Sequence, residues 1–239
     1  AACIMRWASS NHSWQAVSLL VEAGTSLFAL PPSARIHEGL VFTNRDRRTL
    51  LDRMVELLAS LGIDEPVYLL GDAYYACRKI TRALLRSGSH LISRVRITSV
   101  GHEPIALAPN GKRARGRPRI YGQKVPLRTL FDDPAAMVEI QSPYAGDRNI
   151  SLKACVRDLV GKPVGHLVRF VAVEHPTLGR RILLSTDVSR SMAEIIRMYG
   201  GRFKIEVSFK QAIHVLGAYR YHFWMSAMKR IRRRSGDQY

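Results

Sequence analysis

The chain has 239 residues, with 37 Lys and Arg against 19 Asp and Glu, so its formal net charge is +18. Such a charge indicates a polyanionic partner, most often nucleic acid, although a basic protein without such a partner can have the same composition. A hydrophobic content of 46% excludes a disordered basic tail, and the length allows one large domain or two small ones. The 3 cysteines form no C-x-x-C pair, which argues against a disulfide framework and for a reducing compartment.

The N-terminal segment predicts extended structure followed by a helix. Residues 13–36 read as a short helix or strand and then a strand that stops at the pair Pro31-Pro32. Residues 43–61 have leucines at helical spacing, and Thr43 or Asn44 can cap this helix.

A strand, a helix and a second strand are predicted next. Residues 67–70 are uniformly apolar and end at Gly71-Asp72, which is typical of a strand buried on both faces of a sheet. Residues 77–88 predict a helix, and residues 89–96 predict another strand. Two strands joined by a helix through short links indicate an α/β unit with parallel pairing.

The middle of the chain has a different character. Residues 101–122 are rich in Gly, Pro and Arg and predict an exposed, mobile loop. Four strand-like runs separated by turn-like clusters then indicate an antiparallel meander, namely residues 124–131, 135–142, 150–160 and 165–174.

The C-terminal part returns to a buried strand and then to helix. Residues 180–187 are the strand, and Ser191 and Glu194 match a capping box that opens a helix. The pair Gly200-Gly201 is expected to interrupt that helix, so that Tyr199 closes one helix and Arg202 opens the next.

Three segments follow from these elements. Residues 1–97 form the N-terminal part of an α/β core, residues 98–180 a β-rich insertion with a basic loop, and residues 181–239 a C-terminal helical part with a basic tail. No apolar run approaches the roughly 18 residues that a membrane span needs.

Two acids stand out against this basic background. Asp72 follows a buried strand at its C-terminal end, where ligands of open α/β sheets usually bind, although a helix cap or a turn residue is an equally ordinary role. Glu206 lies on a half-buried helix stripe with Arg202 and Lys210, where ion pairing at helical spacing is the simpler explanation. Together, the two carboxylates could share a divalent cation, because hard cations prefer carboxylate oxygens.

The residues around these acids carry a family resemblance. The stretch "YGGRFKIE" resembles the signature of bacterial insertion-sequence transposases with DDE chemistry, in the group marked by a Tyr-Arg-Glu-Lys motif. Tyr199, Arg202 and Glu206 match the spacing of its Tyr, Arg and catalytic Glu. The stretch "YLLGDAYYA" resembles the segment around the second catalytic Asp of that family, which gives Asp72 that role. The similarity spans the chain from about Trp14 onward, and the β-rich insertion lies between Asp72 and Glu206 as in such transposases.

Two positions depart from the family pattern. The family's Lys stands seven residues after Glu, where this chain has Ile213, so Lys210 is the nearest substitute. The family's first Asp lies on the first core strand, whereas the first Asp of this chain is Asp46, inside the predicted helix of residues 43–61. We therefore expect the acid-bearing first strand to lie upstream of Ala1, which makes the chain a fragment without the first catalytic Asp.

The resemblance implies a ribonuclease-H-like core and a DNA transposase that performs Mg²⁺-dependent strand cleavage and strand transfer at transposon ends. It implies two Mg²⁺ ions with Asp72 and Glu206 among their ligands. Arg202 and Lys210 would hold DNA phosphates, and Tyr199 would contact the strand end. A homodimer in a synaptic complex, a cytoplasmic, nucleoid-associated location in bacteria and no membrane partner are expected with it.

A further basic stretch fits DNA. Arg115-Gly116-Arg117-Pro118 resembles the core of hooks that insert Arg into narrow minor grooves, while non-specific phosphate contact by a solvated loop explains it as well. The runner-up function is a non-catalytic DNA-binding remnant or a repurposed transposase. An RNA-binding structural protein has little support, because no aromatic-rich strand of the RNA-recognition type is present.

Overall fold

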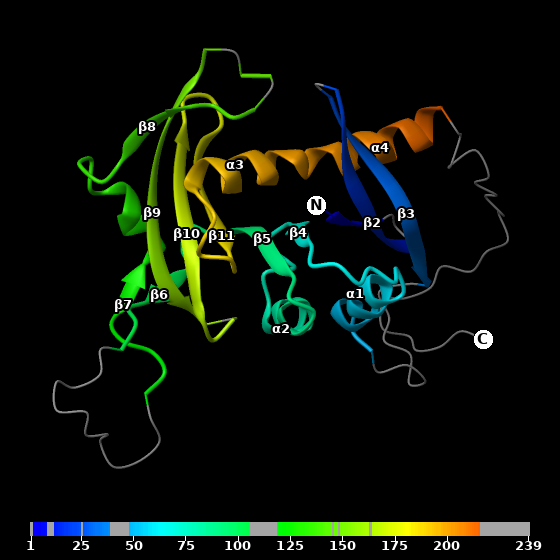
Figure 1. Cartoon of the computed structure of the whole chain (residues 1–239), viewed down its shortest axis with the longest axis horizontal. Coiled ribbons are helices and arrows are strands. Elements are labelled where there is room, and N and C mark those ends of the chain that lie inside the picture. The colour runs from blue at the N-terminus through cyan, green and yellow to red at the C-terminus, as the bar shows by residue number, and fades with distance from the viewer. Residues whose placement is uncertain are drawn as a thin grey trace, which may run out of the picture. The chain divides into compact units, whose positions relative to one another are not determined.

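The structure is a computed structural model that describes residues 2–8, 12–24, 26–38, 48–105, 119–144, 146–147, 149–162 and 164–215. The chain forms two compact units, one of residues 1–64 with 201–239 and the other of residues 65–200 (Figure 1). The two units are defined by packing, whereas the three predicted segments are defined by their order along the chain. The limits of those segments therefore stay a prediction. None of the helices within the described ranges is long and apolar enough to cross a membrane.

The first unit contains an antiparallel meander. Strands β1 (Ala2–Ala8), β2 (His12–Ala23) and β3 (Ser26–Glu38) pair in chain order. Residues 13–36 are therefore strands, and the helix alternative for their first part is wrong. The prediction that the second strand stops at Pro31-Pro32 is also wrong. The register shifts between Val17 and Leu19, opposite the two prolines, and forms a β-bulge there. Proline has no N–H to donate to the ladder, and the bulge accommodates the pair within a continuous strand.

Helix α1 (Leu50–Ala59) follows the meander and begins later than the sequence predicts. Thr49 caps it, since its Oγ1 accepts the backbone N–H of Asp52 at 3.3 Å and the Asp52 carboxylate accepts the N–H of Thr49 at 2.7 Å. The predicted start is wrong because this capping box fixes the first turn. Thr43 and Asn44 lie outside the described residues. Gln15 of β2 donates to the Leu50 carbonyl at 2.7 Å and ties the helix to the sheet.

Helix α4 (Phe203–His214) also belongs to the first unit. Its Ser208 hydroxyl donates to the Ala29 carbonyl of β3 at 2.9 Å, and Ile205 is fully buried. The predicted break near Gly200-Gly201 is present, but it falls at Arg202. Residues beyond 215, including the basic stretch 228–234, lie outside the described part.

The second unit begins with the predicted α/β unit. Strands β4 (Tyr68–Gly71) and β5 (His90–Val95) are parallel, with Leu70 opposite Ile92, and helix α2 (Arg78–Arg86) connects them. This prediction is confirmed. The fully buried apolar side chains explain why the strands read as uniformly apolar runs, namely Leu69, Leu70, Leu91 and Ile92.

An antiparallel ladder continues directly from β5. Strand β11 (Gly179–Ser185) pairs with β5, then follow β10 (Leu167–His175), β9 (Ser151–Gly161), β6 (Val100–His102) and β7 (Lys124–Pro126), while β8 (Val138–Gln141) pairs with β9. The predicted strands in 135–142, 150–160, 165–174 and 180–187 are confirmed. Figure 1 shows β9, β10 and β11 side by side.

Two local predictions in this region are wrong. Residues 127–131 form a 3-10 helix, η1 (Leu127–Phe131), because Leu127, Leu130 and Phe131, at spacings of three and four residues, all pack into the core. Residues 100–102 are strand β6 rather than the start of a loop. A Cβ at Gly101 would collide with the side chain of Leu159, so this glycine lets β6 lie close to β9.

The hydrophobic core of the second unit lies under η1. Its buried residues come from η1 and from one face of the ladder: Leu127, Phe131, Cys155, Leu159, Val164, Val168, Phe170, Ala172, Ile182 and Leu184. The Cys155 thiol donates to the Leu130 carbonyl, and burial raises the pKa of this thiol. We assign Cys155 to packing.

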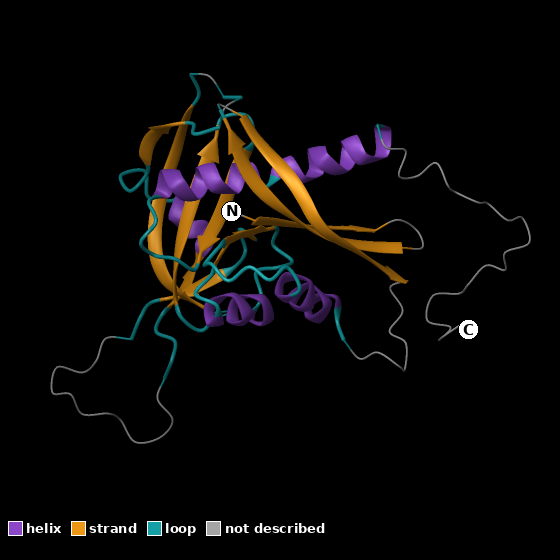
Figure 2. Ribbon diagram, turned by 45° about the vertical axis from the view of Figure 1, so that its right-hand side comes forward, coloured by secondary structure: helices purple, strands orange, loops and turns teal. Residues whose placement is uncertain are grey.

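Helix α3 (Met192–Gly201) begins with the predicted capping box. Ser191 Oγ accepts the Glu194 N–H at 3.3 Å, and the Glu194 carboxylate accepts the Ser191 N–H at 2.9 Å. Near its end, a Cβ at Gly200 would overlap the Tyr144 ring. The helix therefore needs glycine at that position to admit Tyr144. Figure 2 shows α3 beside the strands of this unit.

Candidate active site

Asp72 lies at the C-terminal end of β4, as predicted. Its Oδ1 accepts the backbone N–H of Tyr74 at 2.9 Å, and its carbonyl accepts the N–H of Tyr75 at 3.1 Å, so the residue forms a turn. The turn role considered from the sequence is therefore present. The cap role is not, because Cys77 is the N-cap of α2. Oδ2 of Asp72 accepts no hydrogen bond from the described residues, which leaves one carboxylate oxygen for a ligand.

Ser93 of β5 fixes the backbone at this strand end. It lies opposite Gly71 in the parallel register, is fully buried, and donates its hydroxyl to the Asp72 carbonyl at 2.8 Å. A buried hydroxyl needs such a partner. The contact holds the residue that precedes the turn, and sequence analysis missed it because nothing in "SHLISRVR" distinguishes a structural serine.

Glu206 of α4 forms an ion pair with Arg202. Arg202 Nη2 lies 2.6 Å from Glu206 Oε1, and the two side chains are 20% and 32% exposed. This is the helical-spacing pair that the sequence allowed. Lys210, one turn beyond Glu206 on the same stripe, is exposed. Next to the stripe, Ile205 is fully buried, whereas Phe203 is 60% exposed.

Tyr199 of α3 lines a small cavity in the second unit. The cavity leaves about 20 Å³ for the centres of water molecules, room for roughly one water. It is lined by α3, by the ends of β10 and β11 and by the segment after β8: Tyr144, Val173, His175, Leu178, Gly179, Arg181, Leu183 and Tyr199. Burial raises the pKa of the Tyr144 hydroxyl, and the charge of Arg181 opposes this shift.

One wall of this cavity is held by a histidine of defined tautomer. The backbone N–H groups of Thr177 and Leu178 donate to His175 Nδ1, so the ring proton lies on Nε2 and is donated to Asp147 Oδ2 at 3.0 Å. The Ser142 hydroxyl donates to the same oxygen at 2.7 Å. Hydrogen bonds from Ser142 and then His175 lower the pKa of Asp147. This network fixes the segment that carries Tyr144.

A second polar network lies at the N-terminal ends of β4 and β5, at the edge opposite the one that carries Asp72. The Tyr68 hydroxyl donates to Asp187, and Arg190 Nε donates to the Tyr68 oxygen at 2.8 Å. Burial would raise the pKa of Asp187, but hydrogen bonds from Ser189 and Tyr68 outweigh it and lower the pKa to about 2. Asp187 thus anchors the turn before α3. The motif "STDVSR" contains a turn signal for it, but the partner Tyr68 is distant in sequence.

The described residues supply few metal ligands. They contain no group of three or more His, Cys, Asp or Glu side chains that could hold a metal ion. Asp72 belongs to the unit of residues 65–200 and Glu206 to the other unit, so their joint site stays a prediction. Arg115 and Arg117 lie outside the described residues. The donor chemistry of the two carboxylates fits a hard cation, while their number is too small to fix two cations.

A family model described as "DDE superfamily endonuclease" matches residues 2–154. No curated protein matches. Among solved structures, the chain is similar to the crystal structure of endonuclease V from Bacillus subtilis, with 11% identity over 92% of this chain and 80% of that one, and a TM-score of 0.36.

Proposed function

The chain belongs to the DDE superfamily of endonucleases, and we propose that it is part of a DNA transposase that cleaves and transfers strands at transposon ends. Its mixed α/β fold is the ribonuclease-H-like one expected from the sequence. An endonuclease family implies DNA as the substrate, and the charge of +18 agrees with this partner. Transposition as the specific reaction, a homodimeric synaptic complex and bacterial location belong to the proposal.

The observation that carries the proposal is the position of Asp72. It is an acid at the C-terminal end of a parallel strand, in a turn held by Ser93, with one carboxylate oxygen open. Ligands of α/β sheets bind at this edge. A residue needed only for the turn could equally be Asn or Ser, so the carboxylate is free for chemistry.

Glu206 supplies the second carboxylate in the proposal. In the structure Arg202 pairs with it at 2.6 Å, which orients the carboxylate. When a phosphate approaches, Arg202 can exchange this partner for the phosphate, since guanidinium groups bind both anions with the same geometry. Lys210 is exposed on the same stripe and adds a second phosphate contact.

Nucleases of this superfamily generally use divalent metals, and we propose Mg²⁺ with Asp72 and Glu206 among its ligands. Bound there, the metal would activate the attacking oxygen and neutralise charge on the phosphate. Two carboxylates are too few to hold two such ions. The sequence of β1, "ACIMRWA", contains no acid, so we propose that the first Asp comes from a segment outside these 239 residues.

A second function is supported by the closed Arg202–Glu206 pair. A DNA-binding remnant would keep the basic surface and use Glu206 only for helix stability. The two functions differ in what a restored first acid does to activity.

A plasmid-nicking assay separates them. The 239-residue chain is expected to bind DNA without nicking it. The chain preceded by its natural upstream segment should nick with Mg²⁺, and Asp72→Asn or Glu206→Gln in that longer protein should abolish nicking while DNA binding persists. Nicking that survives Glu206→Gln would remove Glu206 from the mechanism. A longer protein that binds DNA but never nicks would favour the remnant.

A further inference from the structure

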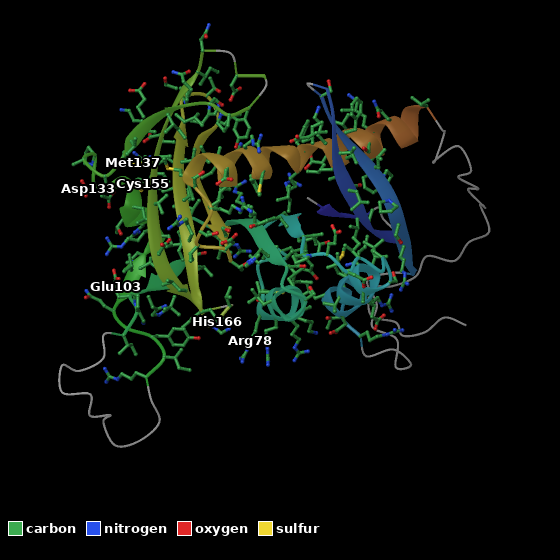
Figure 3. The ribbon with its side chains drawn as sticks, viewed as in Figure 1. Arg78, Glu103, Asp133, Met137, Cys155 and His166 are labelled. Carbon is green, nitrogen blue, oxygen red and sulfur yellow. The ribbon has the colours of Figure 1, made fainter. Side chains whose placement is uncertain are left out.

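Helix α2 presents a purely cationic face to solvent. Arg78, Arg82 and Arg86 follow one another at a spacing of four residues and are all exposed, while Ile80, Thr81 and Leu84 on the other face are buried. Figure 3 labels Arg78, whose side chain extends from α2 into solvent. None of the acids in the described residues pairs with these three arginines.

This arrangement costs helix stability. Arg78 occupies the first turn, where the helix dipole disfavours positive charge, and that turn contains no acid. Like charges four residues apart, as in Arg78 and Arg82 or Arg82 and Arg86, repel each other. A row of cations that weakens its own helix is therefore explained better by an anionic partner than by folding.

The row starts beside the candidate catalytic acid. Helix α2 begins six residues after Asp72, so Arg78 lies at the same edge of the parallel strands as that residue. Arg94 and Arg96, in and just after β5, are exposed and lie beyond the position of Ser93, at this edge too. From Arg78 to Arg86 the helix covers about 12 Å. Measured along the duplex axis, this length corresponds to about three to four phosphates of one strand.

We propose that the exposed face of α2 binds the phosphate backbone of duplex DNA and leads the strand to the edge that carries Asp72. The inference rests on the proposed function, because the anion is identified as DNA through the nuclease family. It assigns a substrate path to residues outside the Tyr-Arg-Glu motif and outside the basic loop. Three arginines without base-reading partners make phosphate contacts, so this surface contributes affinity without sequence preference.

The test compares two triple variants of the 239-residue chain. The first combines Arg78→Gln, Arg82→Gln and Arg86→Gln. The control combines Lys124→Gln, Arg128→Gln and Lys162→Gln, which removes the same charge from exposed positions. These positions lie in or next to β7 and β9, at the far end of the strand order from β4 and β5, which α2 connects. Binding to a random-sequence duplex is measured over a series of salt concentrations, and thermal unfolding is measured without DNA.

The α2 variant is expected to lose at least about ten-fold in affinity and to have a salt slope shallower by about 2 to 3, because each phosphate contact contributes about 0.9 to the slope. Its melting temperature should equal or exceed that of the unchanged chain, since Gln is a good helix former and the repulsion is gone. The control should keep nearly the full slope.

The outcomes separate the inference from the proposed function. An unchanged slope in the α2 variant, with normal binding by the unchanged chain, would overturn the α2 surface and leave the nuclease proposal intact. Equal losses in both variants would also overturn it, because they would show that total charge alone decides affinity. Absence of salt-dependent DNA binding by the unchanged chain would count against the proposed function itself. Polyglutamate serves as a second anionic probe. If the α2 face bound polyglutamate more tightly than DNA, the assignment of this surface to nucleic acid would be contradicted.

Discussion

The two acids proposed for catalysis lie in regions that hold them in different ways. Asp72 ends a buried strand, and its backbone is fixed by Ser93 and by the turn to Tyr74 and Tyr75. Glu206 lies on a half-exposed helix face, and one ion pair with Arg202 orients it. Buried groups therefore fix the strand end and leave one oxygen of the Asp72 carboxylate unengaged. The orientation of Glu206 depends instead on an arginine, a residue that also binds phosphate.

The largest loss of stability is expected at Gly200 of α3, the helix before the one that carries Glu206. Gly200→Ala should destabilise the chain by about 1–3 kcal/mol, because the new methyl group would overlap the Tyr144 ring in a packed contact. Chemical denaturation measures the loss. Gly146→Ala is the matched control, since nothing lies within 4 Å of a Cβ there, and it should change stability by less than about 0.5 kcal/mol. Similar losses in both variants would contradict the Tyr144 contact.

The next largest loss of stability is expected for Asp187, an acid with a structural role, and it provides a reference for Asp72. Asp187→Asn is expected to cost about 2 kcal/mol at neutral pH, because the pKa of Asp187 is lowered to about 2 in the folded chain. A lowered pKa stabilises the fold above the ordinary value of 3.8, and this contribution fades as the pH falls toward 2. The difference in stability between the two proteins should therefore shrink over that range in pH-dependent denaturation.

Asp72→Asn provides the contrast. Asn keeps the side-chain oxygen that accepts the Tyr74 N–H, so the turn should remain and the loss of stability should stay below about 1 kcal/mol. A loss as large as that of Asp187→Asn would show that the Asp72 carboxylate is needed for folding, and would weaken its proposed role in chemistry.

The smallest effect concerns the ion pair on α4. Arg202→Gln should change stability by only about 0.5 kcal/mol, the usual size for a partly exposed pair at this spacing. The same change should weaken DNA binding several-fold, because the guanidinium is proposed to move to a phosphate. Lys204→Gln, an exposed change on the same helix, is the control. Equal binding by both variants would leave Arg202 with a structural role alone.

Local sequence signals predicted much of this structure and failed where distant residues decide. The β4–α2–β5 unit, the position of Asp72 and the Ser191 capping box were predictable because their causes lie within a few residues. The bulge that carries Pro31-Pro32 was not, since it depends on the register with β2.

The same limit applies to the candidate site. Asp72 and Glu206 could be named from their motifs, but the hydroxyl of Ser93 comes from a neighbouring strand. Gly200 could be read only as a helix breaker, because its close neighbour Tyr144 is far away in the sequence. The α2 surface was not predicted for another reason. The three arginines are recognised as one exposed face only once the structure shows that Ile80 and Leu84 are buried on the opposite face of the helix.

The most direct test of the central claim is Mn²⁺ binding, followed by electron paramagnetic resonance of the free ion, with Mn²⁺ standing in for Mg²⁺. The unchanged chain, Asp72→Asn, Glu206→Gln and the double variant form a cycle that measures the coupling between the two acids. If both carboxylates hold one cation, each single variant should lose most of the affinity and the double variant should lose little more. Losses that simply add, or a Glu206→Gln variant that binds Mn²⁺ as tightly as the unchanged chain, would contradict a shared site.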